Sequence, residues 1–170
     1  MSAATVLPAD PVTSRTLTDQ DLGLLLLLAN GTSLAGLARH GFPRRQVRER
    51  LSALRPLLGA ATGRPEETVF LAVAHGLIDP PPGVPTVLCA STFVFLADLA
   101  LGRDTRVMAA RDGTRGERWY DALSRRALSE AGARSQAHAV YLHASDLLAI
   151  SAEEMTAMRQ AARTERAGLP

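Results

Sequence analysis

Arginine is concentrated in one short stretch of the chain, between residues 44 and 55. The five basic residues in this stretch are accompanied by a single acid, Glu49; they are Arg44, Arg45, Arg48, Arg50 and Arg55. Guanidinium groups form paired hydrogen bonds with phosphate oxygens and with the acceptor edge of guanine. Such a cluster on a helix therefore fits contact with a nucleic acid, and a solvated charged surface is the alternative interpretation.

The apolar residues of the same stretch predict the helix that would hold these arginines. Val47, Leu51, Leu54 and Leu58 repeat at the spacing of one helical stripe. Because Pro43 suits the first position of a helix and Gly59 suits the end, we expect a helix over 43–58. A shorter helix over 34–40, capped by Ser33, should precede it, with Gly41 in the turn between them. Leu34, Leu37 and Ala38 are expected to face the core from this shorter helix.

Two further helices complete the first part of the chain. Thr18 and Asp21 have the spacing of a capping box, which predicts a helix from Thr18 to about Asn30. Its leucines lie on most of its sides, so we expect this helix to be buried on several sides or to form a second interface. A fourth helix is expected over 65–75, and the proline-rich residues 79–86 should then form a linker.

Residues 17–78 resemble the DNA-binding domain of LuxR-type regulators. The matching positions are Leu17, Thr18, Asp21, Leu24, Leu25, Ala29, Gly31, Ser33, Ala35, Leu37, Ala38, Val47, Leu51, Leu54, Leu58, Gly59, Gly76, Leu77 and Ile78. The resemblance implies a four-helix domain with a helix-turn-helix, whose third helix reads the major groove of DNA. The chain departs from the family in a turn near His40 that is one residue shorter, and in a longer loop over 60–64.

The second half of the chain repeats the apolar pattern of the first at a spacing of 71 residues. The repeat pairs Leu17 with Leu88, Leu28 with Leu99, Ala29 with Ala100, Gly31 with Gly102 and Ala38 with Ala109. With one residue inserted, Trp119 and Leu123 stand at the positions of Val47 and Leu51. We therefore predict a diverged second helix-turn-helix unit over 87–150, and chance similarity between helical segments is the alternative. Its counterparts of the base-reading positions are Tyr120, Asp121 and Ser124, a poor set for contact with phosphate.

The last part of the chain has the signature of one more helix. Ser151 and Glu154 form a second capping-box pattern, which predicts a helix to about Arg166. Its thin apolar stripe, Met155, Met158 and Ala162, could pack on the body or pair with another chain. The expected fold class is therefore all-α, with tandem four-helix units at 16–78 and 87–150 and a C-terminal helix and tail at 151–170. Residues 1–15 are expected to be a disordered tail.

Composition restricts the remaining function classes. All 19 basic residues are arginine, but 17 acids leave a net charge of only +2, so total charge alone does not argue for nucleic acid. The single cysteine, Cys89, excludes an intrachain disulfide and fits a reducing cytoplasm. The longest apolar run, over 22–29, is too short to span a membrane. The four histidines lack the spacing of a metal site or a catalytic triad, so no enzymatic activity, metal or cofactor is expected.

The expected function is that of a bacterial, sequence-specific DNA-binding transcriptional regulator, located in the cytoplasm at the nucleoid. The resemblance places base reading at Arg48, Glu49 and Ser52, and position and charge suit Ser33, Arg44 and Arg45 to phosphates. The expected DNA-binding residues are Ser33, Arg44, Arg45, Arg48, Glu49, Ser52 and Arg55. A homodimer, or contact with RNA polymerase, would be compatible with this function. The alternative is a helical adaptor or anti-regulator that binds a sigma factor, polymerase or another regulator.

Overall fold

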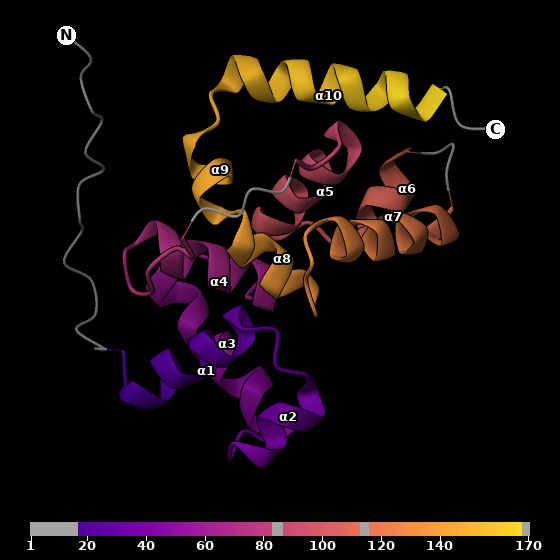
Figure 1. The fold of residues 1–170 in the computed structure, drawn as a ribbon. Helices are drawn as coiled ribbons and strands as arrows, with labels where there is room; N and C mark the ends of the chain where they lie inside the picture. The colour runs from indigo at the N-terminus through magenta and orange to yellow at the C-terminus, as the bar shows by residue number, and fades with distance from the viewer. Residues whose placement is uncertain (1–16, 83–86, 113–115, 168–170) are drawn as a thin grey trace, which may run out of the picture.

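The computed structural model describes residues 17–82, 87–112 and 116–167, and within these ranges the chain forms helices and turns but no strand (Figure 1). Its helices are α1 Asp19–Ala29, α2 Leu34–Arg39, α3 Arg44–Leu58, α4 Pro65–Ala74, α5 Ala90–Ala100, α6 Thr105–Asp112, α7 Glu117–Glu130, α8 Gln136–Leu142, α9 Ala144–Ala149 and α10 Ala152–Ala167. The expected all-α class is confirmed. The tail expected at 1–15 and the second half of the linker, residues 83–86, lie outside the described residues.

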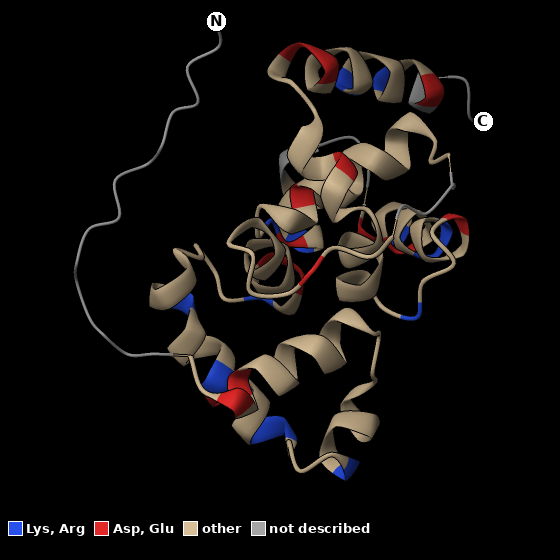
Figure 2. Ribbon diagram, turned by 60° about the vertical axis from the view of Figure 1, so that its left-hand side comes forward, with Lys and Arg blue, Asp and Glu red and all other residues tan. Residues whose placement is uncertain are grey.

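Basic and acidic residues occur in both halves of the molecule rather than in separate regions (Figure 2). None of the described helices is both long and apolar enough to cross a membrane.

The expected capping box begins α1. The Thr18 backbone N–H donates to Asp21 Oδ2 at 3.1 Å, and the Asp21 N–H donates to Thr18 Oγ1 at 3.2 Å. Burial alone would raise the pKa of Asp21, but hydrogen bonds from Thr18 and Arg50 lower it below its ordinary value. The carboxylate is therefore ionised at neutral pH, where it also suits the positive end of the helix dipole.

The short helix α2 buries fewer apolar residues than its sequence pattern predicts. Leu37 is fully buried, as expected, but Leu34 is 53% exposed and Ala38 is also exposed. The buried residues of α2 are Gly36 and Leu37, so the side that faces the core is offset from the predicted stripe of Leu34, Leu37 and Ala38. Leu34 lines a groove instead, together with Leu101 and Val107 of the second half.

The helices of the second half recur at the predicted 71-residue spacing. Both ends of α5 lie 71 residues after the ends of α1, and α6 and α8 begin 71 residues after α2 and α4. Gly102, the counterpart of Gly31, also follows its helix with a positive φ. The spacing of the elements therefore matches the repeat, and superposition of the two units stays a prediction.

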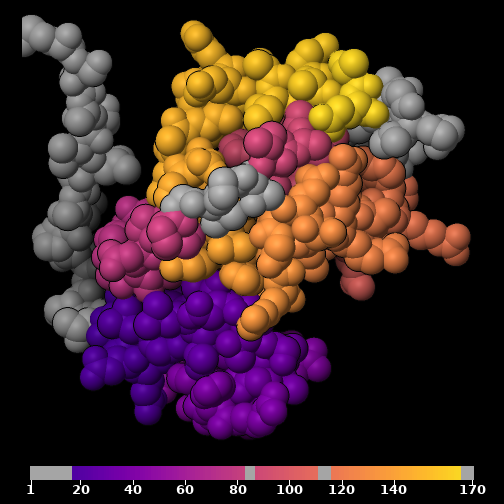
Figure 3. All heavy atoms as spheres, viewed as in Figure 1, coloured from indigo at the N-terminus to yellow at the C-terminus, as the bar shows by residue number. Residues whose placement is uncertain are grey.

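The two halves pack against each other through reciprocal contacts. Helix α4 lies along α8, while α1 contacts α8 and α5 contacts α4. Phe70, on α4, packs against the apolar cores of both halves. In the space-filling view the first half meets the second half directly, without a gap between them (Figure 3). Contacts exchanged in this way are typical of two copies of one unit packed about a two-fold axis.

This reciprocity extends to individual residues. A Cβ added to Gly31 would lie 2.8 Å from His138 Nδ1, and one added to Gly102 would lie 2.8 Å from the Glu67 carboxyl carbon. The 71-residue spacing that separates Gly31 from Gly102 also separates Glu67 from His138. The same close approach is therefore made twice, once from each half to the other.

Helix α7 turns a different side to the core than its sequence alignment predicts. Its buried residues are Tyr120, Leu123 and Ala127, whereas Trp119 is only half-buried against the Tyr120 ring, with the ring centroids 4.8 Å apart. The expectation that Tyr120 stands at an exposed base-reading position is wrong, because Tyr120 is 5% exposed. Helix α7 begins two residues later than a 71-residue shift of α3 would place it, so its apolar stripe is one residue out of register with an alignment that inserts only one residue.

The C-terminal helix packs on the body of the molecule. The expected capping box is present, since Ser151 N–H donates to Glu154 Oε2 at 2.8 Å and Glu154 N–H donates to Ser151 Oγ at 3.2 Å. Helix α10 then lies along α5, where Ala162 is buried. Near its other end, Glu165 accepts hydrogen bonds from the first backbone N–H groups of α5, at Ala90 and Ser91, both at 3.1 Å. A carboxylate from α10 thereby caps α5.

Candidate nucleic-acid interface

Helices α2 and α3 and the short turn between them position all seven residues predicted to contact DNA. Ser33 caps α2, where its hydroxyl oxygen accepts a hydrogen bond from the Gly36 N–H at 3.1 Å. The other six residues lie on α3, and all seven are exposed. The opposite side of α3 is anchored in the first core by Val47, Leu51, Leu54 and Leu58, each buried. The predicted stripe is therefore confirmed, and it directs the exposed residues outward.

The exposed residues of α3 lie along two different sides of the helix. One side lines a groove and carries Arg44, Arg48 and Ser52 at four-residue spacing. Its two arginines have no ion pair among the described residues. On the other side, Arg45 Nε lies 2.7 Å from Glu49 Oε1. The sequence left open whether Glu49 contacts a base or holds Arg45 or Arg50 in place, and in this structure it pairs with Arg45.

Two more of the five arginines, besides Arg45, are engaged within the protein. Arg50 forms an ion pair with Asp21 at 2.7 Å, hydrogen-bonds Gln20, and lies 5.9 Å from the centroid of the Phe42 ring. Its side chain is only 21% exposed, so it joins α3 to the first turn of α1 rather than facing a ligand. Arg55 is exposed, and its Nε donates to the Ala60 carbonyl at 3.3 Å, in the loop after α3.

The groove beside Arg44 and Arg48 is built by both halves of the chain and has a volume of about 1060 Å³. One wall is α3 with Leu34 of α2, and residues 62–65 also contribute. The other wall is formed by the turn between α5 and α6 and by the start of α6, with Leu101, Gly102, Arg103, Asp104 and Val107. The sequence did not predict this second wall. The only signal there was Gly102, which recurs 71 residues after Gly31 and says nothing about a groove.

Most charges in the groove are already paired. Arg64 lies 2.5 Å from Asp104, an ion pair that joins the two halves, and Arg103 lies 2.5 Å from Asp98. Arg44 and Arg48 are thus the cations of the groove that have no ion pair among the described residues. Each can approach an anion without first giving up a partner within the protein.

Apolar side chains occupy the remaining surface of the groove. Leu34 is 53% exposed, Leu101 is 55% exposed and Val107 is 46% exposed, and all three line it. Exposed aliphatic side chains that cluster in one hollow mark a contact surface more often than a merely solvated one. The groove therefore offers an unpaired cationic edge and an apolar wall.

Glu67 organises the loop between α3 and α4, which is longer than in the family that the sequence resembles. Its carboxylate accepts hydrogen bonds from the N–H groups of Ala61, Thr62 and Gly63 at 2.6, 2.9 and 3.0 Å. The Thr62 hydroxyl donates a fourth, at 2.6 Å. Burial alone would raise the pKa of Glu67, but these hydrogen bonds lower it. Nothing in the sequence pattern marked this residue.

No group of three histidine, cysteine, aspartate or glutamate residues in the described ranges could hold a metal ion. Comparison of the chain with protein-family models, with curated proteins and with solved structures finds no match. The candidate interface is thus defined by its own geometry and charge.

Proposed function

We propose that this protein is a sequence-specific DNA-binding transcriptional regulator that reads the major groove with α3. The observation that carries the proposal is the pair Arg44 and Arg48, which are exposed, one turn apart and without an ion pair among the described residues. They extend from a helix whose other side is buried, beside the capped start of α2. A rigid helix with unpaired guanidinium groups supports both phosphate contact and base reading.

In the proposed complex the residues of α2 and α3 have different roles. Arg48 and Ser52 contact base edges, and Arg44, Arg45 and Ser33 contact phosphates, as in the LuxR-type domains that the sequence resembles. The protein would act in the cytoplasm, at the nucleoid. We assign DNA reading to α3 alone, because Tyr120 on α7 is buried and the residue that follows it, the exposed Asp121, is an acid. One chain would therefore bind one recognition site.

We expect Arg48→Ala to weaken binding to the preferred duplex by about 1–3 kcal/mol and to relax the preference at one base pair. The duplex is first obtained by selection from a random pool, and affinities are then measured by fluorescence anisotropy. Arg163→Ala is the matched control, because Arg163 is an exposed arginine on α10, far from α3. An equal loss of affinity on every duplex would show that Arg48 contacts a phosphate instead of a base. An unchanged affinity would show that α3 is not part of the interface.

The affinity for DNA should also depend steeply on salt. Each phosphate contact contributes about −0.9 to the slope of log affinity against log salt concentration, so phosphate contacts by Arg44, Arg45 and Arg55 predict a slope of roughly −2 to −3, and a further phosphate contact by Arg48 would make it roughly −3 to −4. The double variant Arg44→Ala/Arg48→Ala should reduce the steepness of this slope, by about two units if both contact phosphates and by about one if Arg48 contacts a base. A tight complex with a flat salt dependence would contradict the proposal.

A second candidate function rests on the apolar wall of the groove. Leu34, Leu101 and Val107 are poorly suited to phosphates, but they match the apolar side of a helix. The partner would be a sigma factor, RNA polymerase or another regulator that presents an amphipathic helix with acidic residues toward Arg44 and Arg48. In this function the chain is an adaptor or anti-regulator rather than a DNA reader.

The double variant Leu34→Ser/Val107→Ser separates the two functions. If the protein reads DNA through its arginines, we expect this variant to keep its affinity for the selected duplex within about twofold, because phosphates gain little from aliphatic side chains. If the groove binds a protein helix, the variant should lose binding to purified RNA polymerase and sigma factor in a pull-down. The variant Leu148→Ser, an exposed leucine on α9, controls for the loss of surface leucine.

A further inference from the structure

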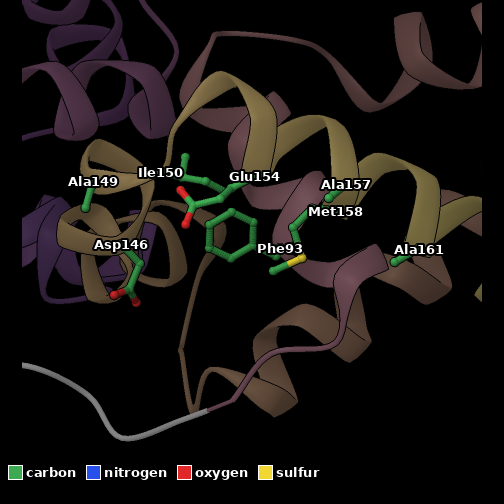
Figure 4. Close-up of a pocket in the computed structure, with 8 residues that line it drawn as sticks. All are labelled: Phe93, Asp146, Ala149, Ile150, Glu154, Ala157, Met158 and Ala161. Atoms are coloured by element: carbon green, nitrogen blue, oxygen red, sulfur yellow. The ribbon is translucent and has the colours of Figure 1, made fainter.

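A hollow of about 540 Å³ opens between α5, α9 and α10, at the end of the molecule opposite to α3 (Figures 1 and 4). Its lining residues are Phe93, Asp146, Ala149, Ile150, Glu154, Ala157, Met158 and Ala161. This volume lies in the range of pockets that hold small molecules. On α10 the lining covers only residues 154–161, about two turns, which is short for the binding site of a partner helix.

The inner surface of the hollow is apolar. The Phe93 ring and the Met158 side chain approach each other there from α5 and α10, and Ile150 lies beside them (Figure 4). Phe93 is 7% exposed, so its ring belongs to the floor of the hollow rather than to its rim. Ala157 and Ala161 are exposed on α10, and their small side chains leave the space that larger ones would fill.

Every charged residue that lines the hollow is acidic. In Figure 4 the Glu154 carboxylate lies to the side of the Phe93 ring, and Asp146 extends from α9. Hydrogen bonds from the backbone and hydroxyl of Ser151 keep the pKa of Glu154 below its ordinary value. Asp146 Oδ2 lies 3.3 Å from Nδ1 of His143, and its side chain is 63% exposed. The apolar floor is therefore combined with a negatively charged rim.

We propose that this hollow binds a small organic cation, with a compact apolar body and an amine or ammonium group. The body would displace water from the floor formed by Phe93, Ile150 and Met158, and the cation would face Glu154 and Asp146. The Phe93 ring offers a further favourable contact for the cation. An anion would be repelled by both carboxylates, and a neutral molecule would gain only the apolar contact. Such a ligand would bridge α9 and α10, and this inference does not depend on DNA binding.

The test is titration of the full chain with compounds that share one apolar body. 1-Aminoadamantane is cationic at neutral pH, 1-adamantanol is neutral and 1-adamantanecarboxylate is anionic. Benzyltrimethylammonium serves as a second cation with a different compact body. Binding is followed by titration calorimetry and by two-dimensional NMR. We expect at least one cation to saturate at millimolar concentration, the matched alcohol to bind roughly three- to tenfold more weakly, and the carboxylate more weakly still.

Paired variants locate the site. Glu154→Gln retains the capping pattern and should weaken cation binding about three- to fivefold, whereas Glu153→Gln, one residue away and outside the lining, should not. Ala157→Phe should fill the hollow and abolish binding, whereas Gln160→Phe on the same helix should not. The inference is overturned if neither cation saturates, if alcohol and amine bind equally, or if the lining variants bind as well as their controls. Self-association through this face, seen in sedimentation as a dimer that Ala157→Phe disrupts, would also overturn it.

Discussion

The variants Leu25→Ala and Leu96→Ala should each lose about 3–4 kcal/mol of the free energy of unfolding, and each should still unfold in a single transition. Leu25 lies in the first apolar core and Leu96 in the second, and both side chains are fully buried. Each substitution leaves a cavity in addition to removing apolar contacts. A single transition is expected because α4 and α8 join the two cores, and Phe70 contacts both.

Two spectroscopic signals make this prediction specific. Trp119 is the only tryptophan and lies in the second half, whereas far-ultraviolet circular dichroism reports on all helices. In urea titrations, Leu25→Ala should shift the Trp119 fluorescence transition as much as the dichroism transition, although Leu25 is in the other half. Leu26→Ala is the control, because Leu26 on the same helix is 46% exposed and should cost well below half as much. Non-coincident transitions would show that the halves unfold independently.

Much of the helical architecture could be predicted because its signals are local. The capping boxes at Thr18 and Ser151 fixed the starts of α1 and α10, and Gly59, with a φ of 67°, ends α3 as expected. The 71-residue repeat anticipated the bounds of α5. In the structure α4 and α8, which begin 71 residues apart, lie along each other.

The candidate site was less predictable because its decisive contacts are distant in sequence. The ion pair of Arg50 with Asp21 removes one arginine from the exposed set, and composition alone does not reveal it. The second wall of the groove, with Leu101 and Val107, comes from the other half of the chain. Tyr120 was misplaced because the alignment inserts one residue where the structure inserts two, and a shift of one residue rotates a helical position by about 100°, enough to turn an exposed position inward.

Replacing Gly102 by alanine should destabilise the fold by roughly 2–5 kcal/mol. A left-handed residue with a Cβ costs about 1–2 kcal/mol, and Gly102 has a φ of 74°. The added Cβ would also lie 2.8–2.9 Å from the Glu67 carboxyl group. That group cannot move aside easily, because Ala61, Thr62 and Gly63 hold it with hydrogen bonds. Disturbing a charged, buried acceptor adds about 1–3 kcal/mol.

Two further variants, Gly132→Ala and Glu67→Ala, separate the cost of the left-handed backbone from the cost of the close approach to the Glu67 carboxylate. Gly132 has a φ of 61° with nothing within 4 Å of an added Cβ, so Gly132→Ala should show only the backbone cost of about 1–2 kcal/mol. Glu67→Ala removes the obstructing carboxylate, and adding Gly102→Ala to it should then cost no more than Gly132→Ala does. The coupling energy from this double-mutant cycle, measured by urea unfolding, should be about 1–3 kcal/mol. Strictly additive losses would mean that Gly102 is needed for its backbone conformation alone, and that close approach of the two halves at this point contributes nothing.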